Sequence, residues 1–275
     1  MIEFDRVSKT FPDGTEAVRE FSLVVPSRTI TVLVGSSGCG KTTLLRMINR
    51  MVDPTEGAIR IDDEDVATLN PVALRRRIGY VLQGGGLLPH RRVLDNIVTV
   101  PRLNGVGRKQ AETRGLELMD TVGLDRDLAR RYPGQLSGGQ QQRVGVARAL
   151  AVDPNILLMD EPFGAVDPIV RADLQNELLR LQSSLDKTVV FVTHDIDEAF
   201  MLGDQVVILR PGGQVAQKGS PADILAAPAD DFVASFIGAE RGQRALRIEN
   251  HDGAQVVVDG RGRPAGVLTA QDTSR

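Results

Sequence analysis

The feature that most restricts the fold is an apolar run that leads directly into a glycine-rich loop. Residues 29–34 read TITVLV, and residues 35–42 read GSSGCGKT. A nearly continuous run of apolar and β-branched residues is typical of a strand buried on both faces of a parallel sheet. Residues 43–49, TLLRMIN, have the composition of a helix. The order strand, loop, helix predicts an α/β domain with a mainly parallel core sheet.

This loop matches a pattern that binds the phosphates of a nucleotide. Its glycines let successive backbone N–H groups face an anion at a helix N-terminus, Lys41 adds a mobile cation, and the Thr42 hydroxyl can contact magnesium. Such a pattern arises by chance in about one chain of this length in a hundred, and the strand and helix around it make chance rarer. The residues that we expect to bind the nucleotide are Gly35, Ser36, Ser37, Gly38, Cys39, Gly40, Lys41, Thr42 and Thr43.

Two adjacent carboxylates follow a second apolar strand, residues 156–159. Asp160 and Glu161 come next, at the strand end where parallel α/β sheets bind their ligands. Asp160 can hold magnesium through its water shell, and Glu161 can orient and deprotonate an attacking water. Two surface acids at a strand end would explain this pattern equally well in isolation. The phosphate loop in the same chain favours the catalytic interpretation.

A second helix start suited to an anion lies at residues 136–140, LSGGQ. Ser137 is a good N-cap, and Gly138 and Gly139 leave backbone N–H groups uncovered in front of Gln140. A glycine-rich turn that only caps a helix is the alternative. One triphosphate does not need two such sites on one chain.

The LSGGQ pentapeptide is the signature of the ATP-binding-cassette family, and a chance match is expected in about one of several thousand chains. The other landmarks follow in the family's order, so the chain resembles this family from residue 2 to about residue 238. The resemblance implies that Gln83 senses magnesium and contacts a membrane partner, and that His194 touches the γ-phosphate and takes part in catalysis with Lys41 and Glu161. It also implies magnesium contacts from Thr42, Gln83 and Asp160.

Two positions depart from the family pattern. Phe11 stands where the family usually has a tyrosine stacked on adenine, and phenylalanine keeps the π face. Residues 164–167 read GAVD where the family more often has SALD. Asp167 is kept and is expected to bind the nucleotide. Gly164 stands where the family has serine, so the contact that this serine makes in the family is in doubt here.

In this family two cassettes bind head to tail, with each ATP between the phosphate loop of one subunit and the signature of the other. The resemblance therefore implies Mg-ATP, a second ATPase subunit, an integral-membrane permease and, indirectly, a solute-binding protein. We expect a homodimer of cassettes, and a dimer with a different cassette stays open. Residues 47–57, 78–83 and 87–90 resemble ATPases of osmoprotectant importers for glycine betaine, choline or proline. Another importer class, or a soluble family member that acts on nucleic acid or ribosomes, stays open. A generic P-loop switch or kinase would leave LSGGQ without a purpose.

Composition restricts the partners and the location. A formal net charge of -3 and a pI near 5.7 give no general attraction to nucleic acid, so we expect no nucleic-acid partner. Cys39 is the single cysteine, which excludes an internal disulfide. The apolar runs are strand-sized, far below the roughly 18 residues of a membrane span. We therefore expect a peripheral protein at the cytoplasmic face of the cell membrane, held there by the permease.

The expected domain is a P-loop ATPase over residues 1–238. Alternating residues at 2–7 and 21–25 predict an N-terminal antiparallel β subdomain, and residues 91–150 form a helical subdomain that carries the signature motif. We expect residues 239–275 to form a tail in which 254–268 resembles a hairpin of a truncated cystathionine-β-synthase-type module. A vestigial tail, or one that only packs, is the favoured interpretation over a sensing function. The remaining expected elements are strands at 58–61, 78–82, 188–193 and 205–209 and a helix at 168–184.

Overall fold

The computed structural model describes residues 1–164, 171–172, 175–176, 178–180, 187–238, 246–251, 254–258 and 264–267. The chain divides into two compact units, Met1–Pro221 and Ala222–Arg275, so the division falls before the expected boundary at about residue 238. Among the described helices, none has the length and apolar character to cross a bilayer.

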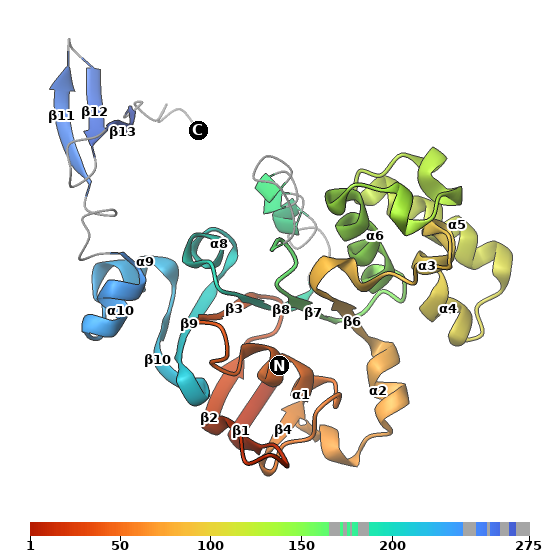
Figure 1. The fold of residues 1–275 in the computed structure, drawn as a ribbon, viewed down its shortest axis with the longest axis horizontal. Helices are drawn as coiled ribbons and strands as arrows, with labels where there is room; N and C mark the ends of the chain where they lie inside the picture. The colour runs from red at the N-terminus through yellow and green to blue at the C-terminus, as the bar shows by residue number, and fades with distance from the viewer. Residues whose placement is uncertain are drawn as a thin grey trace. The chain divides into compact units, whose positions relative to one another are not determined.

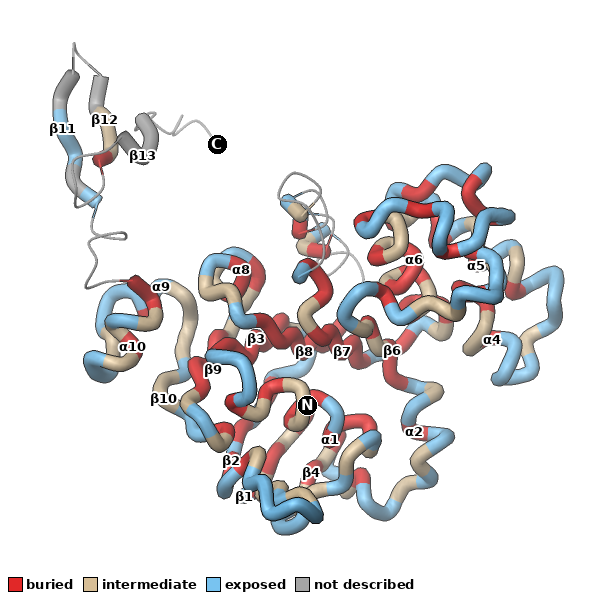
Figure 2. Tube along the Cα trace, in the orientation of Figure 1, coloured by how far each residue is buried: buried red, intermediate tan, exposed pale blue. Residues whose placement is uncertain are grey.

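A six-stranded sheet forms the core of the first unit, with the order β10-β9-β3-β8-β7-β6 (Figure 1). Neighbours from β9 to β6 are parallel, and β10 pairs antiparallel with β9. The three central strands β3, β8 and β7 are buried along their whole length, as Figure 2 shows in red, which explains their uninterrupted apolar sequences. The predicted mainly parallel sheet is confirmed. Its strands are β3 (Ile30–Gly35), β6 (Ile78–Val81), β7 (Ile156–Asp160), β8 (Thr188–Thr193), β9 (Gln205–Arg210) and β10 (Gln214–Gly219).

An antiparallel sheet with the order β2-β1-β4-β5 forms the N-terminal layer. The alternation of its strands buries Phe4 and Phe21, whose rings meet edge to face at 5.1 Å between centroids. The expected strand at residues 58–61 belongs to this layer, because β4 pairs antiparallel with β1. The strands are β1 (Ile2–Thr10), β2 (Glu16–Val25), β4 (Glu56–Ile61) and β5 (Glu64–Asp65), and the packed side chains of helix α1 (Lys41–Ile48) join this layer to the core sheet.

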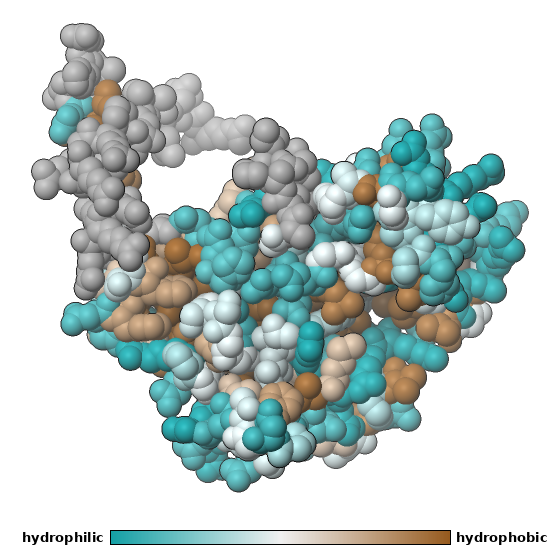
Figure 3. Space-filling view, viewed as in Figure 1, coloured by the Kyte–Doolittle hydropathy of each residue, from teal (hydrophilic) through white to brown (hydrophobic). Residues whose placement is uncertain are grey.

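The predicted helical subdomain is present beside the β6 edge of the core sheet (Figure 1). Its loop at residues 88–92 is tied to α3 by the buried Asn96, whose amide donates to the carbonyls of Leu88, Arg91 and Arg92. The helices are α3 (Val93–Ile97), α4 (Thr99–Leu103), α5 (Arg108–Thr121) and α6 (Gly138–Leu150), and the separate helix α2 (Pro71–Arg77) precedes β6. In the face drawn in Figure 3, the surface of this region is largely hydrophilic, with smaller hydrophobic areas between.

The remaining elements include two short helices and a small sheet in the second unit. Most of the expected helix at residues 168–184 lies outside the described residues, although residues 171–172, 175–176 and 178–180 are helical. The expected hairpin at 254–268 corresponds to two antiparallel strands that belong to a three-stranded sheet. The helix that remains in the first unit is α8 (Ile196–Leu202). The others are α9 (Pro221–Ala226), which begins at the boundary, and α10 (Asp231–Phe236), and the strands of the small sheet are β11 (Arg247–His251), β12 (Ala254–Val258) and β13 (Pro264–Val267).

Candidate functional site

The glycine-rich loop curls between the end of β3 and the start of α1. Gly38 and Gly40 have φ values of 80° and 105°, in the left-handed region that favours glycine. A Cβ on Gly40 would also lie 2.6 Å from the carbonyl oxygen of Ala17. The loop borders a cavity of about 200 Å³ that is lined by Ala17, Ser37, Gly38, Gly40, Lys41, Thr42, Thr43 and Glu161. Six residues expected to bind the nucleotide therefore line one cavity together with the expected catalytic carboxylate.

Lys41 is buried at the first position of α1. Its ammonium donates hydrogen bonds to the carbonyl oxygens of Gly35 at 2.7 Å and Ser36 at 2.9 Å. The recorded hydrogen bonds thus hold this positive charge beside the cavity with neutral acceptors. A phosphate would be a stronger acceptor for the same ammonium, because hydrogen bonds between two charged groups are about twice as strong as neutral ones.

Asp160 lies at the end of β7, with only 5% of its surface exposed. Its Oδ1 accepts a hydrogen bond from the Thr42 hydroxyl at 2.9 Å, and its Oδ2 accepts one from the Tyr80 hydroxyl at 3.3 Å. The Arg46 guanidinium lies 3.8 Å from Oδ2. These oxygens suit Mg²⁺, which commonly binds one or two protein carboxylates together with substrate phosphates. Thr42 and Asp160, which the sequence places 118 residues apart, could therefore hold the ion together.

Tyr80 and Arg46 contact Asp160, and the sequence pattern did not single them out. Burial, followed by the charge of Asp160, raises the pKa of Tyr80 to about 12. The hydroxyl therefore keeps its proton at neutral pH and serves as a donor to the carboxylate. Tyr80 stands on β6 and Asp160 on the neighbouring β7, so their contact depends on the strand order and not on any local pattern.

Glu161, Gln83 and His194 come together from three separate segments. The His194 Nδ1 atom lies 3.3 Å from one carboxylate oxygen of Glu161, and the Gln83 amide donates to the other at 3.4 Å. Glu161 has a left-handed backbone with φ of 43°, which turns the chain out of the β7 direction. The structure thus brings these three predicted site residues together, and their roles in hydrolysis stay predictions.

The LSGGQ segment forms the start of α6 as a capping box. Ser137 Oγ accepts from the Gln140 N–H at 3.3 Å, while Gln140 Oε1 accepts from the Ser137 N–H at 3.0 Å. Ser137 and Gly138 are exposed and Gly139 is buried. In Figure 1, α6 lies with the other helices of the helical subdomain, well apart from α1. Among the described residues that line the cavity at the start of α1, none belongs to the LSGGQ segment, so the two helix starts do not share that cavity.

For two predicted nucleotide-binding residues, Phe11 and Asp167, the structure does not test the prediction. Phe11 directly follows β1, and the Lys9 ammonium lies 5.4 Å from its ring centroid, so a cation already faces this ring. Adenine stacking on Phe11 stays a prediction. Asp167 lies outside the described residues.

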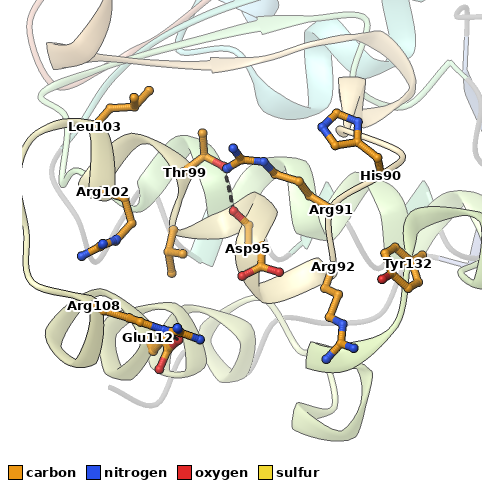
Figure 4. Close-up of a pocket in the computed structure, with 11 residues that line it drawn as sticks. His90, Arg91, Arg92, Asp95, Thr99, Arg102, Leu103, Arg108, Glu112 and Tyr132 are labelled. Atoms are coloured by element: carbon orange, nitrogen blue, oxygen red, sulfur yellow. Dashed lines mark hydrogen bonds and ion pairs between the residues drawn. The ribbon is translucent and has the colours of Figure 1, made fainter.

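A larger cavity of about 640 Å³ lies among the helices α3 to α5 (Figure 4). Arginines dominate the charge of its lining. Arg108 is paired with Glu112 at 2.8 Å, and the Arg92 guanidinium lies 5.9 Å from the ring of Tyr132. The lining as a whole consists of His90, Arg91, Arg92, Asp95, Val98, Thr99, Arg102, Leu103, Arg108, Glu112 and Tyr132. Four arginines against two carboxylates make this surface attractive to an acidic partner.

Comparison with known proteins places this geometry in a family. A family profile described as "ABC transporter" matches residues 18–164. The chain is similar to the choline transport ATP-binding protein OpuBA of Bacillus subtilis (strain 168), with 50% identity over 241 residues that make up 88% of this chain and 63% of OpuBA. It is also similar to the glycine betaine uptake system ATP-binding protein YehX of Escherichia coli (strain K12), with 49% identity over 251 residues, 91% of this chain and 81% of YehX.

A solved structure is similar as well. It is a dimeric post-hydrolysis state of the ATP-binding cassette MJ0796 bound to ADP and Pi, which superposes with a TM-score of 0.73 and 34% identity over 80% of this chain and 99% of that chain. The chain spans 60–63% of the length of the first curated relatives that it matches. Because the profile covers both the glycine-rich loop and the carboxylate pair, and because relatives share 49–50% identity, the chain belongs to the ABC transporter family.

Proposed function

We propose that this chain is the ATP-hydrolysing subunit of an importer, and that it binds Mg-ATP between two copies arranged head to tail. The observation that carries the proposal is the separation of two anion-receptive helix starts within one subunit. The first borders the 200 Å³ cavity with Lys41, and the second presents Ser137 and Gly138 to solvent on another subdomain. Two copies can bring unlike surfaces together on one triphosphate, whereas one copy cannot.

The residues around the cavity fit the roles that hydrolysis requires. Glu161 lines the cavity and would orient and deprotonate the attacking water. His194 fixes one carboxylate oxygen of Glu161 and is more than half exposed, so it can also reach a γ-phosphate. Mg²⁺, when bound by Thr42, Asp160 and Gln83, would neutralise charge on the phosphates.

The shared site can be tested by mixing two inactive proteins. Ser137→Arg removes the signature surface and Glu161→Gln removes the base, so each homodimer should be inactive. In a mixed dimer, one site combines the intact Glu161 of one copy with the intact Ser137 of the other. Random exchange of subunits at equal concentrations should therefore restore about a quarter of the wild-type ATPase rate.

The control for the mixture is a double variant that carries both substitutions on one chain. In a dimer of one wild-type copy and one double-variant copy, one site contains the Ser137→Arg substitution and the other contains Glu161→Gln. Such a mixed dimer therefore has no intact site. Full activity of Ser137→Arg alone, or of a strictly monomeric preparation, would contradict the shared site.

The similar proteins named for choline and glycine betaine transport support a more specific proposal, uptake of an osmoprotectant such as glycine betaine, choline or proline. A separate permease would hold the chain at the cytoplasmic face of the membrane. We place the permease contact at the arginine-rich cavity of Figure 4, because His90 belongs both to its lining and to the segment that resembles osmoprotectant ATPases. A solute-binding protein would act through the permease.

Uptake and capture experiments test this part. A strain that lacks the gene should lose uptake of a labelled osmoprotectant, and the wild-type gene should restore uptake while Lys41→Ala should not. The tagged chain should copurify with an integral-membrane protein. Association with ribosomes or DNA alone would overturn the transport proposal in favour of a nucleic-acid function.

A further inference from the structure

The turn that carries Gln83 is closed by a backbone hydrogen bond from the Gly85 N–H to the Leu82 carbonyl oxygen at 2.9 Å. It spans η2 (Gln83–Gly86), and its three glycines have φ values of 66°, 78° and 53°. Glycine adopts this left-handed region readily but restricts the backbone less than any other residue. Contacts from a neighbouring element would restrict this glycine-rich turn further and so help to keep the Gln83 amide beside Glu161.

That element is α6, which touches the turn backbone to backbone. A Cβ on Gly145 would lie 3.1 Å from the Gly85 Cα and 3.2 Å from its carbonyl oxygen. Conversely, a Cβ on Gly85 would lie 2.8 Å from the Gln141 carbonyl oxygen. Both glycines are therefore needed for the close approach.

Arg148 fastens the same turn to α6. Its Nη2 atom donates to the Gly85 carbonyl oxygen and its Nη1 atom to the Gly86 carbonyl oxygen, both at 2.8 Å. Within the described part of the chain, these two carbonyls are its recorded partners, and no ion pair with a carboxylate is found. The Arg148 guanidinium is half-buried and donates to two neutral carbonyl oxygens of the turn. Two parallel donors fix the orientation of the turn as well as its distance from α6.

We propose that Arg148 is a positioning residue for Gln83, and that it joins the Gln83 turn to the helix that begins at the LSGGQ signature. The inference rests on the proposed function. Ser137 and Arg148 are separated by about 16 Å along one helix. Any movement of α6 that follows nucleotide contact at Ser137 is thereby carried to Gln83, and through it to Glu161 of the same subunit.

A double-mutant cycle tests this inference. Arg148→Met should lower kcat about tenfold without changing the dissociation constant for ATP, and Arg148→Lys, which can keep one bond, should fall between Arg148→Met and wild type. If Arg148 acts through Gln83, the double variant with Gln83→Ala should be no slower than Gln83→Ala alone.

The matched control is Arg143→Met, because Arg143 on the same helix donates to the Val122 carbonyl at 2.7 Å, away from the turn. Its effect should multiply with that of Gln83→Ala.

Hydrogen exchange of the turn gives a readout that does not depend on activity. Arg148→Met should speed exchange at residues 83–86, whereas Arg143→Met should not. Unchanged exchange, or rates for Arg148→Met that multiply with Gln83→Ala, would overturn the inference. Normal hydrolysis by Gln83→Ala alone would instead contradict the role of Gln83 in the proposed function, and the exchange result would then decide whether Arg148 positions the turn.

Discussion

Replacing Glu161 with glutamine is expected to lower kcat for ATP hydrolysis by about 10²–10⁴-fold, the usual contribution of a positioned general base. The amide has the same size and can still accept from the Gln83 side chain, but it cannot take a proton from water. Because Lys41 and the glycine-rich loop are unchanged, the affinity for ATP should stay near that of the wild type. Bound ATP should therefore accumulate, and with it the dimer. Steady-state hydrolysis, equilibrium ATP binding and size-exclusion chromatography with ATP measure these three outcomes.

The matched control for this variant is Glu56→Gln. Glu56 is exposed at the start of β4 and lies outside the cavity lining, so its replacement should leave hydrolysis unchanged. If Glu161→Gln hydrolysed ATP at the wild-type rate, another group would have to be the base. A loss of ATP binding in that variant would point to a damaged cavity and not to a missing proton acceptor.

The parts of the site that could be predicted from the sequence are those encoded by consecutive residues. The strand, loop and helix from residue 29 to residue 49 form one local unit, and the glycines at 38 and 40 have the left-handed backbone that the curl of this loop requires. His194 and Gln83 were assigned by their order along the chain. The structure places both within 3.4 Å of Glu161, because His194 directly follows β8 and Gln83 lies two residues after the end of β6 in the same sheet.

What could not be predicted depends on contacts between distant segments. Tyr80 approaches Asp160 only because β6 and β7 are neighbours, and no residue near Tyr80 signals that pairing. The strand at 56–61 has the same alternation whether it joins the antiparallel or the parallel sheet. β10 has no buried residue at all, so its sequence gives no periodic signal, and it forms through backbone pairing with β9.

Replacing Lys41 with alanine is expected to raise the dissociation constant for ATP by about 10–100-fold, because a charged hydrogen bond contributes about 1.5–3 kcal/mol. The ammonium lies at the cavity wall, and the loop offers the phosphates only neutral N–H groups besides it. Hydrolysis should fall together with binding, since the same cation faces the phosphates in both steps. Titration with a fluorescent ATP analogue and steady-state kinetics measure the two effects.

Lys187→Ala separates loss of the nucleotide contact from loss of a buried lysine. Lys187 is also buried, and its ammonium is paired with Asp153 at 2.8 Å, outside the cavity lining. Its replacement should lower the melting temperature and leave the affinity for ATP unchanged, whereas Lys41→Ala should lower the affinity in a folded protein. If both variants lost ATP binding to the same extent, instability would be the cause. Unaltered affinity in Lys41→Ala would show that the glycine-rich loop binds the phosphates without its cation, against the role assigned to Lys41.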